Sequence, residues 1–128
     1  MITTFILILM AVIFDAAADA ERDEENKPLS HVFEALSILS FLMLVFVYPG
    51  RTAQDFFVTV FGMYVVQRFM LFDMCYNAVR GIELDYIGNT SFVDRFWRWT
   101  HFPYFGIFWI RVIVWIGYTI GVLVNYKM

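Results

Sequence analysis

A few ionisable side chains inside or beside long apolar stretches are the residues of this chain that could do chemistry. Asp15 and Asp19 are four residues apart, His31 and Glu34 are three apart, and Asp73 lies in a later apolar stretch. Residues with these spacings share one face of a helix, so each pair presents two side chains together. Carboxylate oxygens and imidazole nitrogens suit Zn, Mn or Fe. The five residues therefore form a candidate metal site on facing helices.

This donor set differs from that of the helical bundles that bind two iron ions. Those bundles use two Glu-x-x-His units and two further Glu residues, whereas this sequence has one His-x-x-Glu unit, formed by His31 and Glu34. The sequence also lacks the short motifs of serine hydrolases, nucleotide-binding proteins and zinc proteases. No catalytic residue is predicted.

A structural use of the same charges is the main alternative. Arg68 and Arg111 also lie in apolar stretches, and they could form ion pairs with Asp15, Glu34 or Asp73. Such pairs would hold helices together, because a charge in an apolar environment is tolerated only when it has partners. A proton or ion pathway is a third use, but the opposite half of the bundle offers few polar side chains to continue it.

The composition indicates an integral membrane protein. Of the 128 residues, 61% are hydrophobic and 16% are charged, against about 45–50% and about 25% in soluble domains. The apolar residues form blocks, and a helix of about 20 apolar residues crosses ~30 Å of hydrocarbon. We predict an all-α polytopic helical bundle in one membrane domain, residues 1–128, with four transmembrane helices at about 2–20, 30–48, 52–80 and 103–126.

Helix starts are predicted from capping residues. Pro28 ends a charged run, and Ser30 after it is expected to be the N-cap of the second helix. Thr52 is expected to cap the third helix, because Asp55 follows it with the spacing of a capping box.

A short amphipathic helix is predicted at about 91–102, where aromatic and charged residues alternate. We expect it to lie at the membrane interface, with Trp97 and Trp99 in the aromatic belt. In the last transmembrane helix, Gly117 and Gly121 have the spacing that lets helices approach closely. Packing within the chain is favoured for them over dimerisation.

The positive-inside rule predicts the orientation. The loops at residues 21–30 and 80–102 carry five basic residues, whereas the opposite side carries Arg51 and Lys127. The loops are therefore expected to be cytoplasmic and both termini outside. If residues 1–20 were instead a cleaved signal peptide, the orientation would reverse.

The function predicted from these features is a non-enzymatic membrane subunit or accessory factor. Its partners would be the lipid bilayer and further copies of itself or a larger membrane complex. Nucleic acid is excluded, because the net charge is −3 and no basic face is present. The alternatives are a metal-binding protein or metal-dependent membrane enzyme, and a small pore-forming (holin-like) or ion-conducting protein.

Overall fold

Five α-helices make up the part of the chain that the structure, a computed structural model, describes: residues 1–48, 52–87, 92–101 and 103–125. All but the fourth are long and apolar enough to cross a membrane. The prediction of an all-helical chain with four such helices is confirmed at this level. The helices are α1 (Ile2–Asp23), α2 (Lys27–Val47), α3 (Ala53–Arg80), α4 (Phe92–Trp99) and α5 (Tyr104–Asn125).

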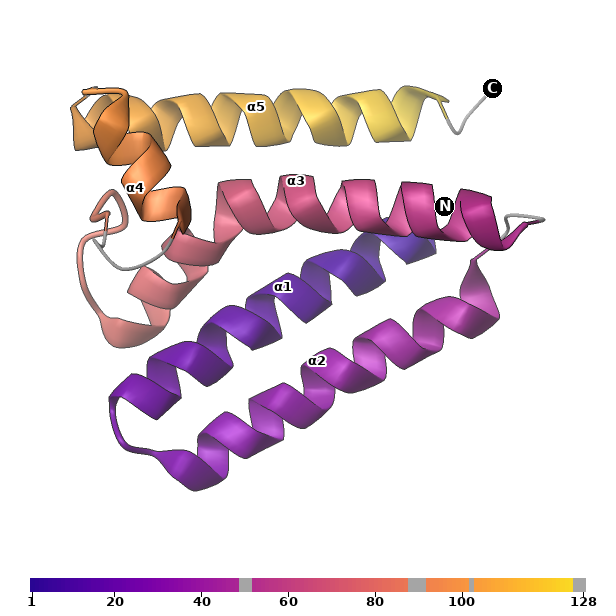
Figure 1. Cartoon of the computed structure of the whole chain (residues 1–128), viewed down its shortest axis with the longest axis horizontal. Coiled ribbons are helices and arrows are strands. Elements are labelled where there is room, and N and C mark those ends of the chain that lie inside the picture. The colour runs from indigo at the N-terminus through magenta and orange to yellow at the C-terminus, as the bar shows by residue number, and fades with distance from the viewer. Residues whose placement is uncertain (49–51, 88–91, 102, 126–128) are drawn as a thin grey trace.

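The four long helices lie side by side in the order α2, α1, α3, α5 (Figure 1). Helix α1 is therefore the central helix, with α2 on one side and α3 on the other. The start of α1 and the end of α5 lie at one end of the bundle, which we call the terminal end. The α1–α2 turn and α4 lie at the opposite end, which we call the loop end (Figure 1).

Small residues allow α2 to pack closely on α1. Ser37 Oγ donates a hydrogen bond of 3.2 Å to the carbonyl oxygen of Ala11, and Ser30 Oγ donates one of 2.9 Å to that of Ala18. Ser37 lies seven residues after Ser30, and Ala11 lies seven residues before Ala18. Each interval is two helical turns, and the two helices run in opposite directions. The two bonds therefore fix one antiparallel register, and they require close backbones because a serine side chain is short.

The predicted start of the second helix at Ser30 is wrong. Helix α2 begins at Lys27, with Asn26 as its N-cap and Pro28 in its first turn. Proline is tolerated there, because the first N–H groups of a helix have no partner within the helix. The hydroxyl of Ser30 is instead used in the contact with α1. Helix α1 also continues past residue 20 to Asp23, which shortens the turn.

The predicted cap of the third helix is confirmed, since the backbone N–H of Asp55 donates a 3.0 Å hydrogen bond to Thr52 Oγ1. Helix α3 ends at Gly81, whose φ of 66° is the left-handed conformation that glycine adopts at low cost. Helix α4 falls within the predicted segment 91–102. The predicted boundaries at residues 91, 102 and 126 lie outside the described residues.

Two apolar clusters occupy opposite ends of the bundle. The cluster at the terminal end joins all four long helices, whereas that at the loop end lies beneath α4. The terminal-end cluster comprises Phe5, Ile8, Leu44, Val60, Met63 and Val122, and the loop-end cluster comprises Ile87, Trp97 and Ile107.

We expect Ala11→Leu to destabilise the protein by about 1–3 kcal/mol, because Ala11 is fully buried against α2 and a larger side chain would separate the helices. Thermal unfolding in detergent, followed by circular dichroism, would measure the loss. Ala35→Leu is the matched control, since Ala35 is on the exposed face of α2. Equal losses in the two variants would contradict the close-packed interface.

Candidate functional site

The predicted metal ligands fall into three separate groups. Asp15 and Asp73 belong to different ion pairs, whereas Asp19, His31 and Glu34 lie together beside the α1–α2 turn. Among the described residues, which include all five, no group of three or more His, Cys, Asp and Glu side chains could hold a metal ion. The arrangement therefore does not favour the predicted Zn, Mn or Fe site.

The most buried ion pair joins α3 to α5. Arg111 Nη2 donates a hydrogen bond of 2.7 Å to Asp73 Oδ2, and the side chains are 3% and 16% exposed, respectively. Each charge is thus compensated mainly by the other. Removal of one partner from such a pair leaves a buried charge without compensation, which costs more than the pair itself contributes.

Helix α4 covers this pair with an aromatic ring. The guanidinium carbon of Arg111 lies 5.0 Å from the centroid of the Trp97 ring, a cation–π contact. Trp97 is buried together with Asp94, three residues before it on the same face of α4. The prediction that Trp97 lies in the aromatic belt is therefore wrong, because its ring is buried in the bundle. Trp99 is 75% exposed.

The sequence contained a signal for this role of Trp97. Asp94 and Trp97 are three residues apart, whereas Phe96 and Trp99 form a second such pair, and the two pairs lie on different faces of one helix. Which pair faces the bundle depends on the orientation of α4, which the periodicity of a short helix does not determine.

A second ion pair joins α1 to α3. Arg68 Nη1 donates hydrogen bonds to Asp15 Oδ2 and, at 3.2 Å, to the hydroxyl of Tyr64. The guanidinium carbon also lies 4.1 Å from the centroid of the Phe72 ring. Arg68 and Asp15 are half-buried. The aromatic rings cover part of the Arg68 side chain, and its charge remains paired with Asp15.

A third group links α1 to α2 at the loop end. Arg22 donates hydrogen bonds to Asp19, at 2.9 Å, and to Glu34, whose other oxygen lies 3.0 Å from His31 Nδ1. Arg22 and His31 are mostly exposed, at 54% and 74%, whereas Asp19 and Glu34 are half-buried. Exposed pairs of this kind contribute little to stability individually, because water and salt screen them.

A fourth polar contact, which the sequence did not suggest, links the ends of α1 and α3. The Tyr76 hydroxyl donates to Asp23 Oδ2 and accepts a 2.9 Å hydrogen bond from Arg80 Nη1. Arg80 Nε also lies 3.9 Å from a carboxylate oxygen of Glu24. Asp23 and Glu24, at the end of α1, are therefore bound to the end of α3 by polar contacts.

These contacts give the candidate site a consistent character. Each of the four carboxylates proposed as metal ligands is bonded to an arginine of the same chain. All three arginines, Arg22, Arg68 and Arg111, reach a carboxylate on a different long helix. The polar residues therefore connect α1 to α2, α1 to α3 and α3 to α5, which are the contacts that define the bundle.

The two glycines predicted to mediate helix packing have open space beside them. Gly117 is exposed, and Gly121 lies in the wall of a groove between α3 and α5. A Cβ atom added at either position would meet no atom of another helix within 4 Å.

Comparison of the chain with protein-family profiles, curated proteins and solved structures finds no match.

We expect Arg111→Gln to destabilise the protein by about 3–5 kcal/mol, because it leaves Asp73 buried without its cation. Addition of Asp73→Asn to this variant should restore part of the loss, since both charges are then removed. Thermal or denaturant-induced unfolding in detergent would measure both effects.

Arg22→Gln is the control, because Arg22 forms similar pairs but is 54% exposed. A loss as large in Arg22→Gln as in Arg111→Gln would show that burial does not govern the strength of these pairs. Absence of recovery in the double variant would show that the interaction is not one of compensating charges.

Proposed function

We propose that this protein is a small non-enzymatic integral membrane protein that serves as a subunit or accessory factor of a larger membrane complex. The observation that carries this proposal is the internal pairing of its carboxylates with arginines. A carboxylate that is bonded to an arginine binds a metal ion less readily, because the metal must compete with the arginine. The ionisable residues then serve the bundle, and the outward faces are left to contact partners.

The energetics of ionisable groups support insertion as four spans. An isolated Asp or Arg at the centre of a membrane helix costs about 2.5–3.5 kcal/mol on insertion scales. In this chain Asp15 is paired with Arg68, and Asp73 with Arg111, so two costly charges become one neutral pair in each case. In the membrane, α4 would lie at the interface, with exposed Trp99 and Arg95 near the lipid headgroups.

The outward faces supply the surface for a partner. Large apolar side chains stand exposed along the long helices, with Phe46 of α2 at 82% and Phe57 of α3 at 69%. Helices α2 and α5 are the two outer helices in the order α2, α1, α3, α5 (Figure 1). In a bilayer such faces contact either lipid or the helices of another protein, and both environments are apolar.

A metal-dependent function is the alternative that remains to be tested. A metal ion would have to displace Arg68, Arg111 or Arg22 from the carboxylates they bind. It would also have to bring together ligands that now lie in three groups. Both changes would cost more than binding to an open site.

Two measurements on the protein purified from its membrane in mild detergent test the proposed function. We expect elemental analysis to find less than one equivalent of Zn, Mn or Fe per chain, and native gel electrophoresis to show a complex larger than the 15.1 kDa chain. One equivalent of metal that is lost in His31→Ala and Glu34→Ala would contradict the proposal. So would a monomeric protein, or an assembly of this chain alone that conducts ions across a planar bilayer.

We also propose that both termini lie outside the cytoplasm and that the loops at 21–30 and 80–102 lie inside it. The distribution of basic residues supports this orientation. Figure 1 supports one part of this proposal, that the two termini share a side, because the start of α1 and the end of α5 lie at one end of the bundle.

The orientation can be tested with epitope tags at both termini and a cysteine at Glu25 in a Cys75→Ser background. We expect protease added to intact cells to remove both tags, and an impermeant thiol reagent to label residue 25 only after the membrane is opened. Labelling of intact cells would reverse the orientation. Absence of the N-terminal tag from the mature protein would indicate a cleaved signal peptide.

A further inference from the structure

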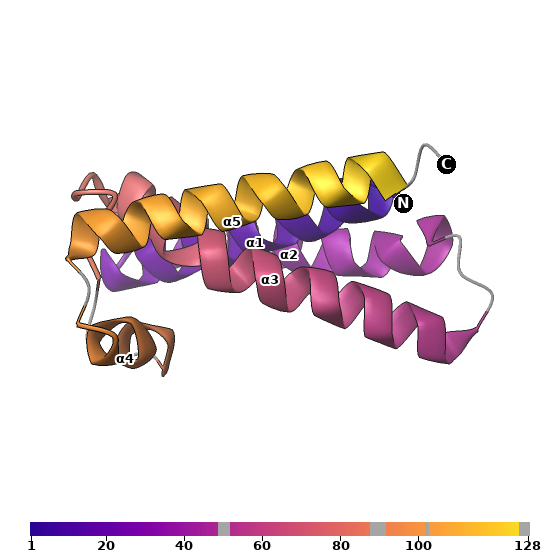
Figure 2. The same cartoon turned by 90° about the horizontal axis from the view of Figure 1, so that it is seen from above.

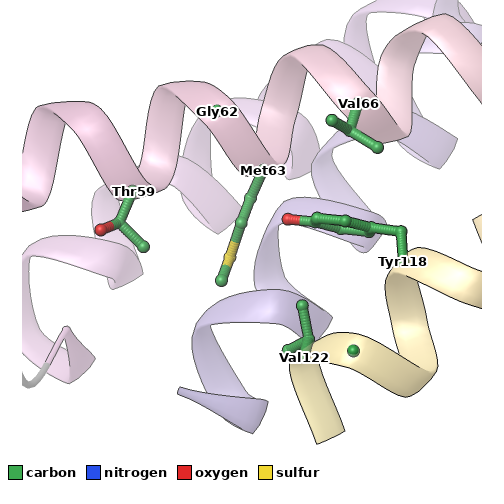
Figure 3. A pocket seen from close by; sticks show the side chains of 7 residues that line it. Thr59, Gly62, Met63, Val66, Tyr118 and Val122 are labelled. Carbon is green, nitrogen blue, oxygen red and sulfur yellow. The ribbon is translucent and has the colours of Figure 1, made fainter. Parts of the chain in front are cut away.

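A groove of about 500 Å³ lies between the N-terminal half of α3 and the C-terminal half of α5. Its α3 wall extends from Thr59 to Val66 and its α5 wall from Tyr118 to Val122 (Figure 3). The volume is within the range of about 300–1,000 Å³ that is typical of ligand pockets. None of the residues that line it is charged.

Two glycines on opposite walls keep the groove open. Gly62 of α3 and Gly121 of α5 both line it, and a Cβ atom at either position would meet no atom of another helix within 4 Å. The two helices also diverge from the loop end toward the terminal end (Figure 2). The separation of the two helices therefore increases toward the terminal end, the side from which a molecule in that leaflet could enter.

The floor of the groove is part of the apolar core. Met63 and Val122, which line the groove, belong to the same cluster as Phe5 and Ile8 of α1. The Phe5 ring also packs against that of Tyr118, with 6.1 Å between the centroids. The groove is therefore a depression with a packed base, and an apolar occupant would gain contacts on three sides.

The length of the groove decides which apolar occupant fits. From Thr59 to Val66 the α3 wall is about 10 Å long at 1.5 Å per residue, which is less than half of the ~30 Å hydrocarbon thickness. A transmembrane helix would need a continuous surface across that thickness. Toward the loop end, however, the Asp73–Arg111 pair holds α3 and α5 together. A flexible hydrocarbon chain occupies one leaflet, about 15 Å or half of that thickness, and the groove covers about two thirds of this depth.

We propose that this groove binds one acyl chain of a phospholipid from the leaflet at the terminal end. The inference depends on the proposed membrane insertion and is independent of the proposed role as a subunit. The chain enters between the diverging ends of α3 and α5, covers Gly62 and Gly121, and stops where the helices close.

Native mass spectrometry of the protein, released from membranes in mild detergent, tests the proposal by counting retained phospholipids. We expect the parent protein to retain one phospholipid and Gly62→Leu/Gly121→Leu to reduce its occupancy at least fivefold, because the leucine side chains occupy the groove. Gly117→Leu is the matched control, since Gly117 is an exposed glycine of α5 outside the groove. It should retain lipid as the parent does.

A smaller substitution keeps the test valid if the leucine variant fails to fold. Gly62→Ala/Gly121→Ala adds only Cβ atoms, for which space exists, and should lower the occupancy by about half without loss of helix content. Equal lipid retention in the parent and both groove variants would overturn the proposal, and so would equal loss in Gly117→Leu. A parent dimer that the groove variants convert to monomers, with lipid unchanged, would assign the groove to a second copy.

Failure of membrane insertion would give a different result. An alkaline carbonate wash would then release the protein from membranes, whereas failure of the acyl-chain proposal alone would leave it in the membrane fraction without a retained lipid.

Discussion

The compensation of buried charge at Asp73 and Arg111 is the interaction on which the outer part of the bundle depends. Helix α5 is an outer helix of the bundle and diverges from α3 toward the terminal end (Figures 1 and 2). Near the loop end, the buried 2.7 Å ion pair holds α5 against α3, and Trp97 of α4 lies over its guanidinium group. This pair therefore fixes α5 against α3 and α4 near the loop end, because separation of its charges would leave each one buried without compensation.

Helix α1 is held by two different kinds of contact. Against α2 it presents small residues, and the serine hydroxyls of α2 reach its backbone carbonyls. Against α3 the contacts at its loop-end half are ion pairs and hydrogen bonds, such as that between Asp15 and Arg68. The first kind sets how close the helices lie, and the second sets which helix is the neighbour. Together they explain why α1 is the most buried of the long helices.

The two ends of the bundle are suited to different tasks. The loop end is polar and internally paired, with arginine bonded to every carboxylate of the predicted metal set. The terminal end is apolar, and its helices separate around a groove lined by glycines. In the function proposed above, the charges define the shape of the bundle and the apolar surfaces are left for lipid or other proteins.

The sequence by itself determined the helices, because the length of each apolar stretch and the cap at Thr52 are local properties. It also identified Arg68 and Arg111 as residues that need acidic partners. It left several partners open for each, and it misplaced the start of α2 because Ser30 has the properties of both a cap and a contact residue. Only the tertiary structure selected Asp15 and Asp73, which lie 53 and 38 residues from their arginines. Such pairs depend on which helices are neighbours and on how each is rotated, and these are properties of the assembled bundle rather than of any local stretch of sequence.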